Sequence, residues 1–325
     1  MVRLAVRSAA IFAALTLVEG AMQERHLSAS ATVPARFRST FERMLLGITA
    51  CLLALASCSG TLPAQSPPNV LFITADDLGL QLGCYGDTVI ETPQLDAFAA
   101  SGVQFDVAYV AQASCSPSRS AMFTGLYVHS TGQYGLTNGT PFALHPHLED
   151  ATIPNILKRA GYRTGIIGKL HVAPGASFQF DYRQTSYVDA RQVKLVAERA
   201  SEFITQSGDQ PFFLMVNYTD PHAYRERDPQ TNQFGDWTFL NRVDGIPETL
   251  VEPSEESVLP FQQIDSPEQR ERVAGYYNEV KRLDIGVGLL LETLERHGRA
   301  DNTLVIFIGD HGPRSTAVRQ RRMKA

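Results

Sequence analysis

The segment ASCSPSRSAMFTG, residues 113–125, places Cys115, Pro117 and Arg119 two residues apart at the expected start of a helix. This spacing matches neither a disulfide framework nor a zinc knuckle. An ordinary thiol at Cys115 would need a neighbouring base to become a nucleophile, and the guanidinium of Arg119 cannot act as one. The chemistry of this segment therefore depends on side chains that the fold brings to it from elsewhere.

Polar side chains follow four apolar runs, which we expect to form strands over residues 69–75, 163–168, 211–218 and 303–308. Continuous apolar runs of this length are typical of strands that are buried on both faces of a sheet. Because the carboxyl ends of the strands form the ligand crevice of an open α/β sheet, we expect the residues after these runs to meet at one rim. These residues are Asp76 and Asp77, Lys169 and His171, Asp220 and His222, and Asp310 and His311.

Asp76, Asp77 and Asp310 would bring three carboxylates together at this rim. An Asp-Asp pair after a single strand is more often a helix N-cap or part of a turn. A third carboxylate at the end of another buried strand favours a metal site, because the three charges would repel one another without a cation between them. Oxygen ligands suit Ca²⁺ or Mg²⁺ rather than zinc.

The basic residues of the rim suit an anionic substrate. Alternation along a strand would point Lys169 and His171 toward the same site, where a cation and an imidazole could serve the substrate and its leaving group. A solvated lysine beside a packed histidine is the alternative. His222 follows Asp220-Pro221, where the proline is expected to fix a turn. A lone histidine is more often structural than catalytic, so its place on the shared rim is what makes His222 a candidate.

Helices are predicted between these strands. Periodicity and boundary residues predict helices over residues 93–101, 118–124, 153–160, 188–206 and 267–297. Residues 103–111 are expected to form a second strand, and residues 223–266 a long surface excursion rich in Pro, Asp, Asn and Gln. Strands that alternate with helices predict an α/β fold with a mostly parallel central sheet and helices on both of its faces.

The overall composition is that of a globular protein. The 325 residues are 44% hydrophobic and 19% charged, which is enough apolar material for a large core. The formal net charge is −5, and Lys and Arg are scattered except in the last few residues, so no nucleic-acid partner is expected. Only Cys84 and Cys115 of the four cysteines lie outside the apolar N-terminal segment, which argues against a disulfide framework.

Residues 1–58 are predicted to be a targeting region with a lipoprotein-type signal. Residues 44–57 form a short apolar run after several arginines, and the LASC sequence that ends at Cys58 resembles the bacterial lipobox. We therefore expect a periplasmic or cell-surface lipoprotein with a lipid anchor to the membrane on Cys58. Cleavage of a plain secretory signal near Ala64 is the alternative. A start codon assigned too far upstream would account for residues 1–43, and residues 59–68 are expected to be a flexible linker.

The segment CSPSR followed by SAMFTG resembles the signature of the sulfatase family, in which the cysteine is oxidised to formylglycine after translation. NVLFITADD, ETPQLDAFAASGVQF, TGIIGKLH, DPH and DHG are each similar to a landmark of that family, in the same order. The resemblance covers residues 69–312, the expected catalytic domain, and implies an alkaline-phosphatase-like fold. It also implies a maturation enzyme that converts Cys115 to formylglycine.

The resemblance implies a role for each candidate residue. Arg119 and Lys169 would balance charge on the sulfuryl oxygens, and His171 and His222 are candidates for protonating the leaving group. One hydroxyl of the hydrated formylglycine would attack sulfur, and the other would expel sulfate as the aldehyde re-forms. The metal, Ca²⁺ or alternatively Mg²⁺, would be held by Asp76, Asp77, the modified Cys115, Asp310 and His311, the last of which is asparagine in many relatives.

The expected substrate also follows from resemblance. CSPSRSAMFTGLYVHSTGQYGL and TGIIGKLHVAPGASFQFDY look closer to the heparan N-sulfatase (sulfamidase) branch than to arylsulfatases. That branch implies removal of N-sulfate from glucosamine units of heparan-type sulfated glycans. Arylsulfatases and O-sulfatases share the same catalytic core and stay open as alternatives.

The end of the chain departs from the family pattern. Family members continue past the Asp-His-Gly motif with more sheet and a small C-terminal subdomain, whereas residues 313–325 form a basic tail without apolar periodicity. We therefore expect a truncated chain in which the C-terminal subdomain is missing. An inactive fragment is one alternative hypothesis, and a lipid-anchored glycan-binding protein without catalysis is a weaker one, against which Cys115 and Arg119 argue.

Overall fold

The computed structural model describes residues 5–7, 67–235, 237–239, 251–254 and 265–313. The predicted signal run, the lipobox at Cys58 and most of the linker lie outside the described residues, as do residues 314–325 of the tail. Within the predicted targeting region only Ala5–Arg7 is described, and it forms a short strand.

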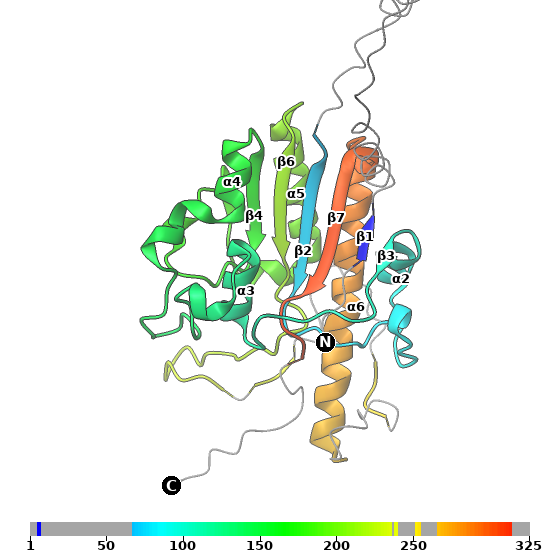
Figure 1. Ribbon diagram of the computed structural model, residues 1–325. Coiled ribbons are helices and arrows are strands. Elements are labelled where there is room, and N and C mark those ends of the chain that lie inside the picture. The colour runs from blue at the N-terminus through cyan, green and yellow to red at the C-terminus, as the bar shows by residue number, and fades with distance from the viewer. Residues whose placement is uncertain (1–4, 8–66, 236, 240–250, 255–264, 314–325) are drawn as a thin grey trace, which may run out of the picture. The chain divides into compact units, whose positions relative to one another are not determined.

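A seven-stranded sheet forms the centre of the described part of the chain, in the order β3-β1-β7-β2-β6-β4-β5 (Figure 1). The five strands from β7 to β5 are parallel, whereas β1 is antiparallel to both of its neighbours. The sheet is therefore mostly parallel, as predicted. Its strands are β1 (Ala5–Arg7), β2 (Asn69–Ala75), β3 (Val103–Gln104), β4 (Arg163–Gly168), β5 (Tyr182–Gln184), β6 (Phe212–Asn217) and β7 (Thr303–Gly309).

Helices cover both faces of this sheet (Figure 1). The α-helices are α2 (Pro93–Ala100), α3 (Cys115–Thr124), α4 (Ile153–Arg159), α5 (Val193–Ser207) and α6 (Pro267–Arg296). The 3₁₀ turns are η2 (Gly83–Tyr85), η3 (Val128–Ser130), η4 (Pro146–Ala151), η5 (Gly175–Ser177), η6 (Asp189–Arg191) and η9 (Ala300–Asn302).

Alternation along β2 shows which helices cover which face. Leu71 and Ile73 belong to a hydrophobic cluster with residues of α2, α5 and α6. Val70 and Phe72 point the other way and pack against a second cluster that includes Phe123 of α3 and against which residues of α4 also pack. Because both faces of the strand are covered, its residues read as a continuous apolar run. This confirms the predicted α/β class with helices on both faces.

Several predicted boundaries were wrong. The strand expected over residues 103–111 is only two residues long, and most of the residues after it are exposed, with Tyr109 87% exposed. The helix expected from residue 118 begins at Cys115, because the extended residue Ser114 precedes it and Pro117 is tolerated in a first turn. The helix expected over residues 188–206 is a 3₁₀ turn followed by α5. Strand β5 was not predicted at all.

Helix α6 begins as predicted at Pro267. The side chain of Ser266 accepts a hydrogen bond of 3.2 Å from the backbone N–H of Gln269, and proline fits the first helical position because no intrahelical bond needs its N–H. The helix then runs for 30 residues and buries one face against the sheet and α5. The buried residues of α6 include the charged side chains of Glu279 and Arg282.

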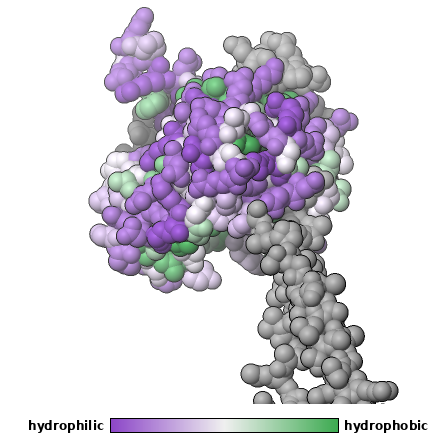
Figure 2. Space-filling model, turned by 90° about the horizontal axis from the view of Figure 1, so that it is seen from above, coloured by the Kyte–Doolittle hydropathy of each residue, from purple (hydrophilic) through white to green (hydrophobic). Residues whose placement is uncertain are grey.

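The described residues of the predicted surface excursion, 223–235, 237–239 and 251–254, lie largely at the surface. Two isolated antiparallel bridges, Tyr224 with Thr238 and Arg227 with Phe234, order the first part of this segment. The face of the molecule in Figure 2 is mainly hydrophilic, with hydrophobic residues only in small scattered areas. Among the described helices, none combines the length and apolar character that a membrane span requires.

Candidate active site

The carboxyl ends of strands β2, β4, β6 and β7 all lie on the same side of the sheet, which forms the rim (Figure 1). Backbone hydrogen bonds continue past the strands and fix the residues that follow. Asp310 N donates to Ala75 O over 2.9 Å, Asp76 N to Asp220 O over 3.2 Å, and Lys169 N to Asn217 O over 3.1 Å. The prediction that the polar strand ends share one rim is confirmed.

Four of the predicted metal ligands lie close together at this rim. Asp76, Asp77, Cys115 and His311 are all buried, and each offers one ligand atom within 4.8 Å of the other three. Cys115 Sγ lies 3.1 Å from His311 Nε2 and 3.5 Å from Asp76 Oδ1. His311 Nε2 lies 3.2 Å from Asp77 Oδ1. The first residue of α3 therefore meets the ends of β2 and β7.

Asp310, the fifth predicted ligand, lies beside this group. Its Oδ1 is 3.4 Å from His311 Nε2 and accepts a hydrogen bond of 3.2 Å from Asp77 N. Its Oδ2 accepts a hydrogen bond of 3.0 Å from Nε of Arg119 and lies 2.9 Å from Nη2 of the same guanidinium. The hydroxyl of Ser118 donates to the backbone carbonyl of Asp310, which ties α3 to the end of β7.

The two predicted cations are buried within the site. Arg119 is fully buried, and its Nη1 donates to the carbonyl of Lys169 over 3.0 Å. Lys169 is 2% exposed, and its ammonium donates to Asp76 Oδ2. The two cations therefore face the carboxylates of Asp76 and Asp310, which follow β2 and β7. Their positive charges could also stabilise an anionic group at the rim.

The electrostatics of the site favour positive charge between the carboxylates. Burial and the neighbouring Asp76 raise the pKa of Asp77 well above its usual value and that of Asp310 to about 6. Burial opposes ionisation of Asp76 too, but Lys169, His311 and Arg119 together hold the pKa of Asp76 well below its usual value. Burial would lower the pKa of His311, yet its hydrogen bonds to Asp76 and Cys115 and the charge of Asp310 raise it to about 11.

These residues fit a divalent cation. Asp77 Oδ1 is buried, accepts no hydrogen bond from the described residues and lies 3.2 Å from His311 Nε2, so this oxygen can serve as a ligand of a cation. Three carboxylates close to one another supply the hard oxygen ligands that Ca²⁺ and Mg²⁺ prefer. With a cation bound, these carboxylates would be held ionised. The site can therefore hold the ion that the sequence predicts, and its geometry does not discriminate between Ca²⁺ and Mg²⁺.

The two other predicted histidines do not belong to the group of candidate metal ligands. Nε2 of His222 is 3.9 Å from Asp77 Oδ2, and its Nδ1 lies 2.6 Å from the carbonyl of Ala223. Because a carbonyl only accepts, Nδ1 carries the proton and Nε2 presents a lone pair to the site in the neutral ring. Burial and the charge of Lys169 lower the pKa of His222.

His171 lies on the Lys169 side of the rim. Its Nε2 is 3.3 Å from Asn138 Oδ1, and its ring packs edge-on against Tyr187 with centroids 5.8 Å apart. Burial, with the charges of Lys169 and Arg119, lowers the pKa of His171 to about 3. Both histidines are thus held uncharged at neutral pH before substrate binds, so either ring has to take up a proton during the reaction before it can donate one to a leaving group.

The reason given for placing Lys169 and His171 together was wrong. Strand β4 ends at Gly168, whose φ of 93° turns the chain out of the extended conformation, and His171 has a φ of 51°. A Cβ at residue 168 would lie 2.0 Å from the carbonyl oxygen of Asn217, so only glycine fits there. A turn therefore directs Lys169 to Asp76 and His171 to Asn138, and strand alternation does not.

Asp220 is not a ligand of the candidate metal site. Its carboxylate accepts hydrogen bonds from Arg191 Nη1 at 2.5 Å and from Arg282 Nε at 2.6 Å, and all three side chains are buried. Arg191 also donates to the carbonyl of His222. Sequence analysis did not single out Arg191 or Arg282. Their only signal is a charged residue within the predicted helical segments, and most such residues are solvated.

We expect Asp77→Asn to weaken Ca²⁺ binding strongly without unfolding the protein. The amide removes a charged ligand, while Asp77 Oδ1 accepts no hydrogen bond within the described residues and would lose only its 3.2 Å ion-pair contact with His311 Nε2. In the parent chain, Ca²⁺ should raise the unfolding temperature because it binds only the folded state. Calorimetric titration and thermal unfolding measure both effects. The matched control is Asp209→Asn at an exposed position, which should leave both unchanged; equal Ca²⁺ affinity in the Asp77 variant would exclude Asp77 as a ligand.

Comparison with known proteins shows what this chain is similar to. A family model described as Sulfatase matches residues 68–325. Human N-sulphoglucosamine sulphohydrolase is 35% identical over 273 residues, which cover 81% of this chain and 53% of the human protein. An ulvan-active sulfatase of Formosa agariphila is 25% identical over 318 residues, which cover 85% of this chain and 51% of that protein. The chain thus spans about half the length of these curated relatives.

A solved structure shares the fold. The crystal structure of Ps i-CgsB in complex with k-i-k-neocarrahexaose superimposes with a TM-score of 0.56 at 26% sequence identity. The match covers 80% of this chain and 62% of that one. The mostly parallel sheet and its helices are therefore an arrangement that this chain shares with a crystallised protein of greater length.

Proposed function

The chain belongs to the sulfatase family, and from this premise we propose that it is a hydrolase that cleaves sulfate ester or sulfamate bonds. One observation carries the proposal. Cys115 begins α3 with its Sγ beside Asp76 and His311, and the buried cations Arg119 and Lys169 lie next to them. Nucleophile, candidate metal ligands and anion-stabilising groups therefore share one rim.

We propose that Cys115 is converted to formylglycine by a maturation enzyme and that the hydrated aldehyde is the nucleophile. A bound Ca²⁺, or alternatively Mg²⁺, would supply Lewis acidity and offset the carboxylates of the site. One hydroxyl of residue 115 would lose its proton and attack sulfur, and the bond from sulfur to the leaving oxygen or nitrogen would break as that atom takes up a proton through His171 or His222. The second hydroxyl would then lose its proton as the aldehyde re-forms and the C–O bond to sulfate breaks, and water would add to the aldehyde to restore the diol. A thiol or a serine could not complete this second step.

Arg119 and Lys169 have a defined part in this scheme. Their positive charges face the position where the sulfuryl group would lie when it reacts at residue 115, and they would stabilise negative charge on its oxygens. Both are held in place by ion pairs with carboxylates that are themselves fixed by the ends of β2 and β7. The site is therefore organised before substrate arrives, which lowers the cost of reorganisation during the reaction.

We expect His222→Ala to slow hydrolysis of substrates with a poor leaving group more than that of 4-nitrophenyl sulfate. A general acid contributes about 10²–10⁴-fold when the leaving group needs a proton, and much less when it leaves as a stable phenolate. His171→Ala, measured on the same substrate pair, is the matched comparison. Whichever variant shows the leaving-group dependence identifies the proton donor. If both variants slow both substrates equally, neither histidine protonates the leaving group.

For the substrate, we propose the N-sulfate of glucosamine units in heparan-type glycans. The support is the 35% identity with human N-sulphoglucosamine sulphohydrolase, together with the sequence segments that resemble that branch. A sulfatase acting on O-sulfate groups is the second candidate, which the similarity to the ulvan-active sulfatase favours. Sulfate release from N-sulfoglucosamine against glucosamine 6-O-sulfate tests the choice. Exclusive release from the O-sulfated sugar would contradict the sulfamidase proposal.

We further propose that the protein is exported and anchored to a membrane by acylation of Cys58. The support is the sequence of the LASC segment after a short apolar run. Metabolic labelling with a radioactive fatty acid tests this proposal. Label should appear in the parent protein and be lost in Cys58→Ala, and an unlabelled parent protein would contradict it.

A further inference from the structure

Asn217, the last residue of β6, holds the backbone of Lys169 through two hydrogen bonds. Its carbonyl oxygen accepts a hydrogen bond of 3.1 Å from Lys169 N, and its side-chain Nδ2 donates one of 2.8 Å to Lys169 O. Asn217 is fully buried, so solvent does not compete for either bond. The two bonds span the turn at Gly168 and fix the direction in which the chain leaves β4.

The hydroxyl of Thr74 fixes the orientation of the Asn217 carboxamide. Thr74 lies opposite Asn217 in the pairing of β2 with β6, and its Oγ1 donates a hydrogen bond of 2.7 Å to Asn217 Oδ1. Because the carbonyl of Lys169 can only accept, the amide nitrogen has to face Lys169 and the amide oxygen has to face the hydroxyl. One orientation of the carboxamide therefore satisfies both neighbours.

The carbonyl of Lys169 connects these contacts with Arg119. Lys169 O accepts a hydrogen bond of 3.0 Å from Arg119 Nη1 as well as the one from Asn217, so both of its lone pairs are used. Arg119 Nη1 also donates to Thr74 Oγ1 over 3.5 Å. Thr74, Arg119 and Asn217 are all 0% exposed. Loss of the Asn217 carboxamide would therefore leave buried polar groups without a partner, which favours a shift of the turn.

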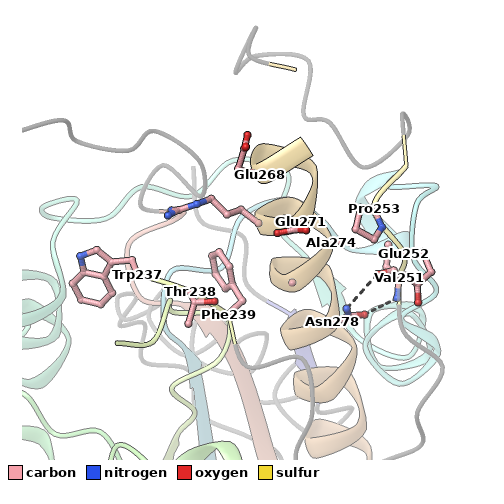
Figure 3. A pocket seen from close by; sticks show the side chains of 12 residues that line it. Trp237, Thr238, Phe239, Val251, Glu252, Pro253, Glu268, Glu271, Ala274 and Asn278 are labelled. Atoms are coloured by element: carbon pink, nitrogen blue, oxygen red, sulfur yellow. Dashed lines mark hydrogen bonds between the residues drawn. The ribbon is translucent and has the colours of Figure 1, made fainter. Parts of the chain in front are cut away.

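A second buried asparagine shows what such contacts do on an apolar residue. Asn278 of α6 accepts a hydrogen bond of 2.6 Å from Val251 N and donates one of 3.3 Å to Val251 O (Figure 3). Both residues line a cavity of about 520 Å³. There the asparagine orders a segment of the backbone, whereas the residue that Asn217 holds is one of the two cations of the rim.

From these contacts we propose that Asn217 is a positioning residue, whose carboxamide holds Lys169 and Arg119 where they can act on an anionic group at the candidate nucleophile. The catalytic consequence rests on the proposed function. The charged ends of the two side chains are already anchored, because the Lys169 ammonium pairs with Asp76 and the Arg119 guanidinium lies 2.9 Å from Asp310 Oδ2. A lysine side chain is flexible, so it keeps one direction only when its backbone is fixed too.

Hydrogen exchange at the Lys169 amide tests this assignment without any substrate. Lysine is rare in this chain, so ¹⁵N-lysine labelling separates the amide signals of Lys169 and of Lys281 in α6. In Asn217→Leu the backbone acceptor of Lys169 N remains, so faster exchange reports a looser turn. We expect the exchange rate of Lys169, divided by that of Lys281, to rise about tenfold over the ratio in the parent protein.

The matched control is Asn155→Leu. Asn155 is 3% exposed, and its side chain donates to the carbonyls of Glu149 and Ser177 over 2.7 and 2.9 Å and accepts from Gln179 N over 2.8 Å. This variant removes buried side-chain hydrogen bonds that do not involve the residues of the rim. It should keep the exchange ratio of the parent protein.

Turnover by the mature enzyme tests the consequence for the reaction. We expect Asn217→Leu to lower kcat for N-sulfoglucosamine about 10²-fold and to change KM much less, because displaced cations stabilise less of the charge that develops in the transition state. Lower stability alone would reduce only the amount of folded enzyme. Expressed per folded molecule, kcat of Asn155→Leu should therefore equal that of the parent enzyme.

Two variants of Thr74 carry the same test if Asn217→Leu does not fold. Thr74→Val has nearly the same shape but removes the hydroxyl that orients the carboxamide, so it should raise the exchange ratio and lower kcat. Thr74→Ser keeps the hydroxyl and should recover most of the parent kcat. Equal kcat values in the two variants would contradict the proposed orientation of Asn217.

The outcomes separate this proposal from the proposed function. An exchange ratio at the parent level in both Asn217→Leu and Thr74→Val would overturn the proposal, whatever the turnover. A raised ratio with parent-like kcat would overturn it as well, because the turn would then not position the cations for the reaction. If the mature parent enzyme releases no sulfate while the ratio rises in Asn217→Leu and not in Asn155→Leu, the proposed function is wrong and the hold of Asn217 on Lys169 stands.

Discussion

Replacing Cys115 by serine should abolish repeated turnover while leaving the fold and the Ca²⁺ site intact. The side chain is 3% exposed at the start of α3, and the smaller hydroxyl fits the same space. Serine can accept a sulfuryl group once but has no second hydroxyl with which to expel it. We therefore expect the steady-state rate to fall by about 10⁴-fold or more, with release of at most one desulfated product per protein molecule.

The matched control is Cys84→Ser. Cys84 is the other cysteine among the described residues; it lies half-buried in η2 and does not belong to the group of candidate metal ligands. This variant should keep the parent rate. Each variant is produced together with a formylglycine-generating enzyme. The rates at which Cys115→Ser and Cys84→Ser release free sulfate from N-sulfoglucosamine are then compared. Parent-like turnover in the Cys115 variant would show that residue 115 is not the nucleophile.

Asp220→Ala should give the largest loss of stability among single substitutions near the site. Asp220 is fully buried, and it receives hydrogen bonds from Arg191 and from two nitrogens of Arg282, both also buried. Glu279 would remain as a partner of both guanidiniums, at 3.0 and 3.6 Å, so part of the charge stays compensated. Removing one partner of a buried ionic network costs about 3–5 kcal/mol. Urea unfolding of the parent protein and of Asp220→Ala measures the difference in their free energies of unfolding.

An exposed ion pair on the same long helix supplies the comparison for Asp220. Glu292 and Arg296 lie one turn apart on α6, 3.8 Å from each other and more than half exposed. Glu292→Ala should cost only about 0.3–0.5 kcal/mol. A loss in Asp220→Ala as small as this would mean that the network around Asp220 does not stabilise the end of β6.

The strands and the shared rim could be predicted because burial on both faces leaves a simple pattern in the sequence. Residues 69–75 and 303–309 are continuous apolar runs, and the parallel pairing of β2 with β7 brings Ala75 opposite Gly309. Asp76 and Asp310 follow directly, so their proximity follows from register alone. Strand β5 lacked this pattern because only Tyr182 among its three residues is buried.

The side-chain directions after β4 could not be predicted in the same way. They depend on a left-handed turn at Gly168 and on the positive φ of His171. Glycine permits such a turn at many positions where the chain stays extended, so its presence does not specify one. The close approach of the Asn217 carbonyl, which excludes a Cβ at residue 168, becomes visible only in the folded structure.

The two arginine partners of Asp220 could not be predicted from the sequence either. Arg191 comes from η6 and Arg282 from the middle of α6, 29 and 62 residues away from Asp220 in the sequence. A charged residue in a helix is usually solvated, and only tertiary packing shows that these two are buried. The sequence therefore indicated that Asp220 lies at the rim, but its role there is to hold the turn that carries His222.

The state of residue 115 in an active preparation tests the central claim most directly. Chymotrypsin should release a peptide that spans residues 110–123, which is suited to mass spectrometry. In a preparation that releases sulfate, we predict the mass of the aldehyde, or of its hydrate, in place of the thiol at residue 115. A preparation that turns over substrate while every such peptide retains the sulfur atom would contradict the claim.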